Sequence, residues 1–303
     1  MSAEIVLQQM IIIFLLIMTG YIVYKRGIIQ NNVAKGISAL VVNVCNPALL
    51  IRSACDHDAS ITYDKILYAV VGGAVLYAVL ILASLFLPKL LSVGEKWKKH
   101  YALMCLFGNT GFIGIPLVSA VFGEHAVIYV AVFNIYFNLL FYTYGIWLAD
   151  GGKNSFSLKN YLNVGNIAIV LTIIIFAFQI RLPEVVTSTV DYMADTTTFL
   201  AMVVIGISLA RTDLKAIFAE KKLYPFIILR FLVIPVAVSF ILRLFIRDDI
   251  VYGVTILMAS VPVANLPLMR VEEVGGDGAV LSKGIILSTV LYLLTIPVVT
   301  LFV

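Results

Sequence analysis

Charged residues are scarce in this 303-residue chain. Asp, Glu, Lys and Arg together make up 13% of it, whereas about 25% is usual in a soluble domain. Hydrophobic residues make up 62%, and the mean hydropathy is +1.05. This composition excludes an ordinary soluble domain and predicts a polytopic α-helical membrane protein. The apolar runs are continuous and do not alternate with a period of two, which disfavours a membrane β-barrel.

Residues and motifs that build reactive centres are also few. The three cysteines, Cys45, Cys55 and Cys105, lack the spacing of a metal or redox site, and we interpret them as small, apolar-compatible residues. The chain contains no HExxH, GxSxG or phosphate-binding P-loop motif. We therefore predict that the protein is not an enzyme and holds no metal or cofactor. Any transport would be driven by gradients, because an ATP-binding segment is missing.

Long apolar windows divide the chain into spans. The amino-terminal window carries Glu4 before it and Lys25–Arg26 after it, the reverse of a signal peptide, so we interpret it as a retained first span. About 20 apolar residues cross a bilayer. Ten windows meet this requirement, near 5–24, 34–52, 66–88, 101–122, 126–148, 164–181, 185–210, 223–244, 249–271 and 279–302. The predicted fold is therefore an all-α bundle of ten transmembrane helices.

The basic residues in the connections predict the orientation. Fifteen Lys and Arg residues fall in the connections of one side and five in those of the other. Because positive loops face the cytoplasm, both termini are predicted to lie outside the cytoplasm of a cell membrane protein. The polar linker 149–163 is then cytoplasmic.

One apolar window contains an interruption. The stretch Leu103–Gly123 carries residues that suit a lipid-facing helix poorly, namely Gly108, Asn109, Thr110, Gly111, Gly114 and Pro116. Glycine frees the backbone and proline removes a helical N–H. Such backbone is tolerated at membrane depth only where protein buries it or where it lines a cavity. The pattern predicts a broken transmembrane helix with a functional role.

The ninth window supplies a counterpart, because it also carries prolines near its middle, Pro262 and Pro267. Five spans precede the linker and five follow it, so residues 1–148 and 164–303 would form two repeats of opposite orientation. Paired interruptions in corresponding spans indicate a binding site near the membrane midplane. We expect the breaks at Pro116 and Pro262, with Pro267 as an alternative to Pro262.

Several separated motifs together resemble a known family. These are GNTGFIGIPL, DTTTFLAMVVIGISLA and MASVPVANLPLM, followed by LSKGIILSTVLYLLTIPVVTL. They occur in the order seen in bacterial members of the auxin efflux carrier family, to which the plant PIN-FORMED carriers belong. The resemblance implies a fold like that of bile acid:sodium symporters, in which broken helices four and nine cross at prolines matching Pro116 and Pro262. It also implies small organic anions as cargo, and a substrate carboxylate near an asparagine matching Asn109. The long central loop of PIN-FORMED carriers has no counterpart in 149–163, so its regulation is not carried over.

Amide and hydroxyl side chains near the breaks are candidate ligands for such an anion. A broken helix exposes N–H groups at the electropositive start of its second half. The candidate substrate-binding residues are Asn46, Asn109, Thr110, Asn138 and Asn265, with Asn134 one turn before Asn138 on the same helix face. For each asparagine the alternative is a hydrogen bond between helices.

Two ionisable residues are candidates for coupling. Asp195 lies at the predicted entrance of span seven and matches an aspartate of the PIN-FORMED carriers. It would titrate with H⁺ or bind a cation, or else it is a hydrated residue at a helix start. Arg230, inside span eight, would hold the anion, pair with Asp195 or reach the cytoplasmic surface.

These patterns together predict a secondary carrier of small organic anions that works by alternating access. Dicarboxylates such as malate or malonate and monocarboxylates both fit the pattern. Spans one, two, six and seven would form a scaffold, and the others would move against it. H⁺, Na⁺ or uniport remain open for the driving force. Expected partners are the anion and the lipid bilayer, with no nucleic acid and with a homodimer left open. The alternative function is a membrane receptor that binds such an anion without moving it.

Overall fold

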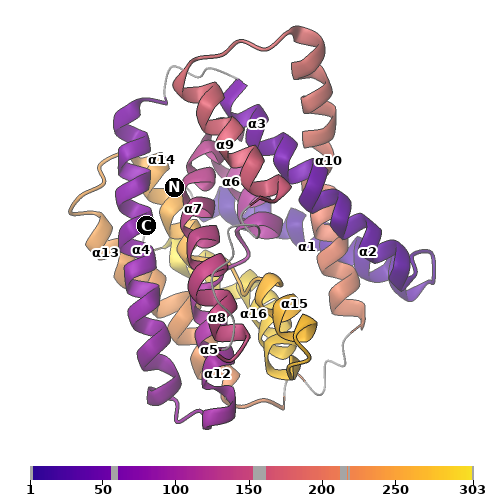
Figure 1. Ribbon diagram of the computed structural model, residues 1–303, viewed down its shortest axis with the longest axis vertical. Helices are drawn as coiled ribbons and strands as arrows, with labels where there is room; N and C mark the ends of the chain where they lie inside the picture. Colours follow the sequence, from indigo (N-terminus) through magenta and orange to yellow (C-terminus); the bar gives the residue numbers. More distant parts are fainter. Residues whose placement is uncertain (1–2, 56–60, 153–161, 212–216, 218, 302–303) are drawn as a thin grey trace.

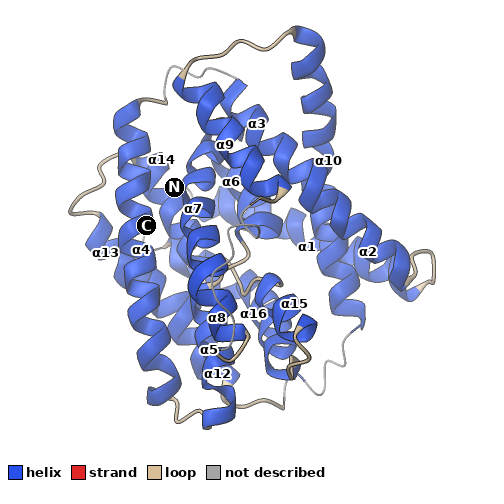
Figure 2. Ribbon diagram, viewed as in Figure 1, coloured by secondary structure: helices blue, strands red, loops and turns tan. Residues whose placement is uncertain are grey.

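The structure is a computed structural model that describes residues 3–55, 61–152, 162–211, 217 and 219–301. Within these ranges every regular element is a helix, as Figure 2 shows. Six helical segments are long and apolar enough to cross a membrane: Val33–Cys55, Tyr63–Leu90, Glu124–Ala149, Glu184–Arg211, Leu223–Leu242 and Ala279–Thr300. Shorter apolar helices occupy the other four predicted windows: Ile11–Lys25, Thr110–Phe122, Val164–Ala177 and Asp249–Ser260.

In the first part of the chain, three of the five predicted spans are not simple helices, because each contains a π turn. Its elements are α1 (Ala3–Lys25), α2 (Asn31–Leu40), η1 (Val41–Cys45), α3 (Asn46–Cys55), α4 (Tyr63–Leu90), α5 (Glu95–Leu106), η2 (Thr110–Gly114), α6 (Ile115–Phe122), η3 (Glu124–Ala126), α7 (Val127–Leu140), η4 (Phe141–Gly145) and α8 (Ile146–Ala149). The four elements η1, η2, η4 and η6 are single wide turns of π-helix, and η3 is a short 3₁₀ turn.

The second part begins beyond the predicted linker, most of which lies outside the described residues. It contains α9 (Val164–Ala177), α10 (Glu184–Arg211), α12 (Leu223–Ile228), η6 (Leu229–Val233), α13 (Ile234–Leu242), α14 (Asp249–Ser260), α15 (Leu266–Glu273) and α16 (Ala279–Thr300). The polar stretch 187–198, near the start of the predicted seventh span, lies inside the uninterrupted helix α10.

Three of the four π turns have a common cause in the sequence. A proline lies two residues after the end of each of these turns: Pro47 after η1, Pro116 after η2 and Pro235 after η6. Proline has no N–H to donate, and its ring crowds the carbonyl four residues earlier. The wider turn accommodates both defects without ending the helix. The fourth π turn, η4, has no such proline, and such turns are frequent at functional sites.

Helices α1 and α10 cross at two glycines, close together in Figure 1. A Cβ at Gly20 would lie 2.3 Å from the carbonyl oxygen of Val203, and one at Gly206 would lie 2.0 Å from that of Ile17. Only glycine permits this approach, and close backbone packing of this kind stabilises helix pairs in membranes. Helix α10 also packs against α3, which in turn packs on α9, so these four spans form one contiguous bundle.

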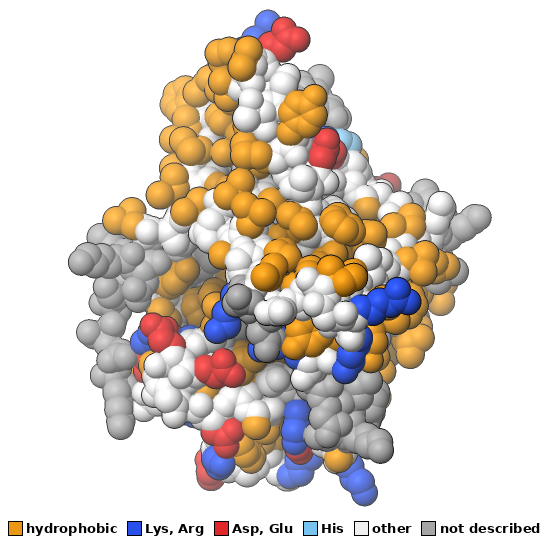
Figure 3. Space-filling view, turned by 90° about the vertical axis from the view of Figure 1, so that its right-hand side faces the viewer, with side chains coloured by type: hydrophobic (Ala, Val, Ile, Leu, Met, Phe, Trp, Pro, Cys, Tyr) orange, Lys and Arg blue, Asp and Glu red, His pale blue; other side chains and the backbone are white. Residues whose placement is uncertain are grey.

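Polar contacts connect loops that the sequence places on the same side of the membrane. At one end, Nζ of Lys96 lies 3.0 Å from Asp277. At the other end, Nζ of Lys65 lies 2.9 Å from Asp248. Each contact joins two connections that were predicted to lie on the same side of the membrane. Lys and Arg side chains gather toward the lower end in Figure 3, where α5 begins, and hydrophobic side chains cover the part above it.

Candidate functional site

Two interrupted helices meet in the middle of the molecule. The chain leaves helical geometry between α5 and η2, and again between α14 and α15. The N–H of Asn109 donates to the carbonyl of Pro262 at 2.6 Å, and the N–H of Ala264 donates to the carbonyl of Phe107 at 2.9 Å. Gly108 and Val263 form an antiparallel bridge between them. Each interruption thus satisfies backbone groups of the other, as buried backbone at membrane depth requires.

Glycine permits this close approach at two positions. A Cβ at Gly108 would lie 2.7 Å from Cγ2 of Val261, and a Cβ at Gly114 would lie 2.9 Å from Cε of Met258. The contact of Gly108 joins the first break itself to Val261, the residue after α14, and the contact of Gly114 joins η2 to α14. A larger residue at either position would push the two interrupted segments apart.

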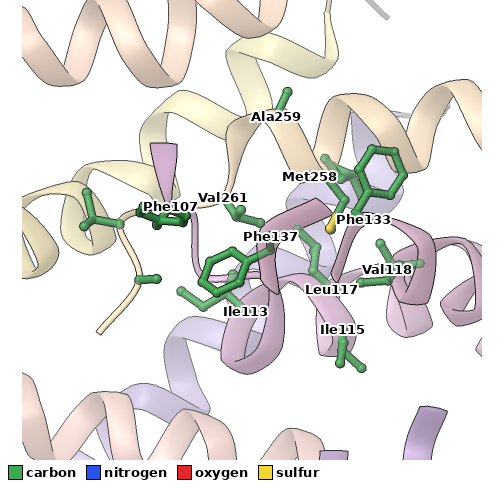
Figure 4. Packing of buried hydrophobic residues seen from close by; sticks show 14 of the residues in the cluster. Phe107, Ile113, Ile115, Leu117, Val118, Phe133, Phe137, Met258, Ala259 and Val261 are labelled. Carbon is green, nitrogen blue, oxygen red and sulfur yellow. The ribbon is translucent and has the colours of Figure 1, made fainter. Parts of the chain in front are cut away.

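Apolar side chains enclose the paired interruptions. Figure 4 shows Phe107, Ile113, Leu117 and Phe137 close to the segment that carries Met258, Ala259 and Val261. The ring of Phe107 packs edge-on against Phe137 and Phe141, with centroids 5.3 and 5.2 Å apart. This packing excludes water from one side of the break, so polar groups there act in a medium of low dielectric constant.

Asn109 and Thr110 lie at the start of the second half of the first interrupted helix. The Oδ1 of Asn109 accepts a hydrogen bond from the N–H of Phe112 at 3.0 Å and so caps that half. The hydroxyl of Thr110 donates to Oδ1 of Asn134 on α7 at 2.6 Å. Both residues are buried, and their polar atoms brace the broken segment.

The other predicted asparagines divide into two groups. Asn46 is 9% exposed and lies against η2, where its Nδ2 would be 3.3 Å from a Cβ at Gly111. Asn265 precedes α15, is partly buried, and does not cap that helix with its side chain. Asn138 instead donates to Oδ1 of Asn166 on α9 at 2.5 Å. That contact is the hydrogen bond between helices that the sequence left as the alternative.

One of the two prolines that were expected to mark the breaks, Pro262, lies in a break, and the other, Pro116, lies beyond it. Pro262 lies inside the second interruption and accepts from Asn109, whereas Pro267 is in the first turn of α15. Pro116 is in the first turn of α6, beyond the π turn, so the first break lies at residues 107–109. Proline suits a first helical turn because its missing N–H would be unpaired there anyway.

Arg230 is fully buried beside the breaks, which corrects two of its three predicted roles. Its Nε donates to the carbonyl of Cys105 at 2.5 Å, and its Nη1 donates to the carbonyl of Ala259 at 2.7 Å. These carbonyls belong to the last turns of α5 and α14. Arg230 therefore neither reaches the cytoplasmic surface nor pairs with Asp195, because the two interrupted helices hold its guanidinium in place.

Asp195 contacts a different arginine. Its carboxylate lies 2.6 Å from Nη1 of Arg52 at the end of α3, and Arg52 also pairs with Glu124 in η3 and lies 3.5 Å from Asp191. Asp195 is well inside α10, which begins at Glu184, so the interpretation as a helix-start residue is wrong. Residues Ser188, Asp191, Tyr192 and Asp195 line an open depression of about 190 Å³ beside this cluster.

Two residues with notable environments, Arg52 and Thr197, were not among the predicted site residues. Arg52 was counted only among the basic residues of the connections, yet it lies at the end of α3 and pairs with Glu124 and Asp195. The hydroxyl of Thr197 on α10 is fully buried without a hydrogen-bond partner among the described residues. No group of three or more His, Cys, Asp or Glu residues in the described ranges could hold a metal ion.

Comparison with known proteins agrees with the architecture. Residues 5–160 and 153–300 match the profile of the family described as membrane transport protein. A protein of Methanothermobacter thermautotrophicus described as an uncharacterized transporter is 26% identical, over 98% of this chain and 96% of its own length. A second uncharacterized transporter, from Methanocaldococcus jannaschii, is 25% identical over 94% of this chain and 95% of its own. The predicted resemblance is thereby confirmed: the chain is a multi-pass membrane protein that belongs to the membrane transport protein family of the auxin efflux carriers.

Proposed function

We propose that this protein is a secondary transporter of small organic anions that binds its substrate at the paired interruptions. The observation that carries the proposal is the position of Arg230. Its guanidinium is fully buried and donates to carbonyls at the ends of both first half-helices, α5 and α14. Burying a lone charge costs several kcal/mol, so this arginine has to be balanced by groups around it.

The helix ends supply that balance. The carboxyl end of a helix carries roughly half a negative charge and the amino end roughly half a positive charge. The carboxyl ends of α5 and α14 together therefore carry about one negative charge, which offsets the positive charge of Arg230. The amino ends of the second halves then remain electropositive. The acidic residues of the two interrupted spans lie at their outer ends, at Glu95, Asp249, Glu272 and Glu273, and residues 96–123 and 250–271 between these ends contain no Asp or Glu. The field at the breaks thus favours an anion over a cation.

The movement that we propose is alternating access between two bundles, in a fold of two inverted five-helix repeats. Helices α1, α2–α3, α9 and α10 would form the scaffold, held together by the glycine crossing of α1 and α10. The interrupted helices and Arg230 lie in the other bundle. Arg52 and Glu124 form an ion pair across the two bundles at the end predicted to face outward. In the proposed cycle this ion pair would help to close the carrier at that end.

The driving force in this proposal is a gradient of H⁺ or Na⁺ or, for a uniporter, the gradient of the anion itself. Asp195 is the candidate coupling acid, because its carboxylate shares Arg52 with Glu124. Protonation of Asp195 would weaken its attraction to Arg52 and change the balance of the ion cluster that joins the bundles.

Flux into reconstituted vesicles tests the proposal. The purified chain is assayed with labelled mono- and dicarboxylates and with labelled organic cations of similar size, with and without imposed pH and Na⁺ gradients. We expect saturable uptake of carboxylates and none of cations. Uptake of cations with no uptake of anions would refute the electrostatic argument. Tight binding of a carboxylate without flux under every gradient would favour the receptor function instead.

A further inference from the structure

Two buried polar atoms on the scaffold bundle have no partner in the described part of the chain. They are Oδ1 of Asn46 on α3 and Oγ1 of Thr197 on α10. The exposed fraction is 9% for Asn46 and 0% for Thr197. Buried polar groups are nearly always hydrogen-bonded, so each exception calls for an explanation. The remaining unpartnered atoms belong to His100 near the start of α5 and to Tyr292 on α16.

Asn46 and Thr197 belong to segments of the scaffold that pack against each other. The residues beside them, Cys45 and Thr196, are in contact, with Sγ and Oγ1 3.4 Å apart. Helix α10 packs against both η1 and η2, and the amide of Asn46 lies against Gly111 in η2. Asn46 therefore lies where the scaffold meets the broken segment, and Thr197 lies on the helix that packs against both.

Thr197 lacks a hydrogen bond that two other buried threonines of this protein make. The hydroxyls of Thr172 and Thr255 donate to the carbonyl four residues earlier, at 2.8 and 2.7 Å. That bond is the usual way for a threonine to satisfy its hydroxyl inside a helix. Thr197 does not make it, so its hydroxyl remains available to a ligand.

We propose that Asn46 and Thr197 form the scaffold half of the substrate site and bind a hydroxyl group of the substrate. This inference rests on the proposed function, in which the electropositive helix ends of the other bundle hold the carboxylate. An amide oxygen is an acceptor only, and a threonine hydroxyl both donates and accepts. A hydroxyl beside the carboxylate would give Asn46 Oδ1 a donor and Thr197 a partner. The substrate class is therefore the 2-hydroxycarboxylates.

The expected selectivity follows from the cost of leaving these groups unpaired. A site built to bind a substrate hydroxyl discriminates against the analogue that lacks it, because its own polar groups then stay buried without partners. For a neutral hydrogen bond we expect a preference of about threefold to tenfold. Malate should compete better than succinate, and lactate better than propionate.

Competition in reconstituted vesicles with three variants tests the inference. Thr197→Val removes the hydroxyl at nearly constant shape, so we expect it to lower the malate-to-succinate ratio toward one without lowering the midpoint of thermal unfolding. Thr197→Ser keeps the hydroxyl and should keep the ratio. The matched control is Thr172→Val, which removes a buried hydroxyl that is satisfied within α9, and it should leave the ratio unchanged.

Each outcome separates this inference from the proposed function. Carboxylate flux with equal competition by malate and succinate would overturn the inference alone, as would a wild-type ratio in Thr197→Val. If that variant cannot be purified, Asn46→Ser serves as the second variant, because its shorter side chain withdraws the acceptor and should also lower the ratio. A Na⁺-dependent rise in the unfolding midpoint that Thr197→Val abolishes, without a hydroxyl preference, would make the two oxygens cation ligands and overturn it. Absence of any carboxylate binding or flux would refute both.

Discussion

The contact between the two interrupted helices can be tested at Gly108. In a Gly108→Ala variant the new Cβ would lie 2.7 Å from Cγ2 of Val261 and 3.2 Å from its carbonyl oxygen. Carbon atoms in contact prefer about 3.5–4.0 Å, so the segments must separate by roughly 1 Å. Val261 is fully buried and its β-branched side chain has few alternative rotamers. The clash therefore has to move the backbone.

The magnitude follows from the bonds that this movement would strain. Overpacking of a filled interior costs about 1–3 kcal/mol. The bond from Asn109 to Pro262, now 2.6 Å long, would lengthen toward the limit of a hydrogen bond, and losing it would cost about 1–3 kcal/mol more. We expect the thermal midpoint in detergent to fall by several degrees and carboxylate flux in vesicles to fall with it.

The matched control is Gly36→Ala on α2, where no heavy atom lies within 4 Å of the added Cβ. Alanine is favoured over glycine inside a helix by up to about 1 kcal/mol, so this variant should be neutral or slightly stabilised. Adding Val261→Ala to Gly108→Ala should recover part of the loss, which a double-mutant cycle would measure. Equal midpoints and equal flux for the two glycine variants would refute the steric argument.

Three further predictions concern charged groups. Glu124→Gln removes an ion pair that Arg52 makes between the bundles. A membrane-impermeant maleimide should therefore label the thiol of Cys55 faster, by at most about fivefold. An unchanged labelling rate would contradict the closure that we assign to this pair. Arg230→Met leaves two buried carbonyls without the donors that they have now, which costs about 1–3 kcal/mol each. Arg230→Lys keeps the charge, so its thermal midpoint should lie between those of Arg230→Met and the wild type. Equal midpoints for all three proteins would refute the role that we assign to Arg230. Burial alone would raise the pKa of Asp248, but N–H groups of α14 and a lysine outweigh it and lower the pKa. The stability that Asp248 contributes is thus present above about pH 4 and is lost as the pH falls through its folded pKa, and the midpoint of Asp248→Asn should lack this acid dependence.

Much of the fold could be predicted because its evidence is local. A run of about 20 apolar residues is a property of the run itself, so helices occupy all ten predicted windows. The glycines and polar residues of 108–114 also indicated a break without any knowledge of the neighbours. The exact position of that break was not local. It lies at residues 107–109 because cross-chain bonds to Pro262 and Ala264 replace the helical ones there.

The partners of individual side chains show the same division more sharply. Asp195 and Arg230 looked like a candidate pair, yet each contacts residues from a distant part of the chain: Arg52 for Asp195, and Cys105 and Ala259 for Arg230. Asn138 was expected at the site but bonds to Asn166 on α9. Nothing in the sequence near Thr197 indicated that its hydroxyl would lack a partner.

The sequence by itself determined the membrane class, the spans, the interrupted stretches and the family, because apolar length, backbone-breaking residues and ordered motifs are properties of continuous segments. Only the tertiary structure decided which groups meet at the two interruptions. Arg230 and Cys105 are 125 positions apart, and Arg52 and Asp195 are 143 apart. Their contact depends on how whole helices cross, and glycines such as Gly20 and Gly206 control that crossing by permitting close approach.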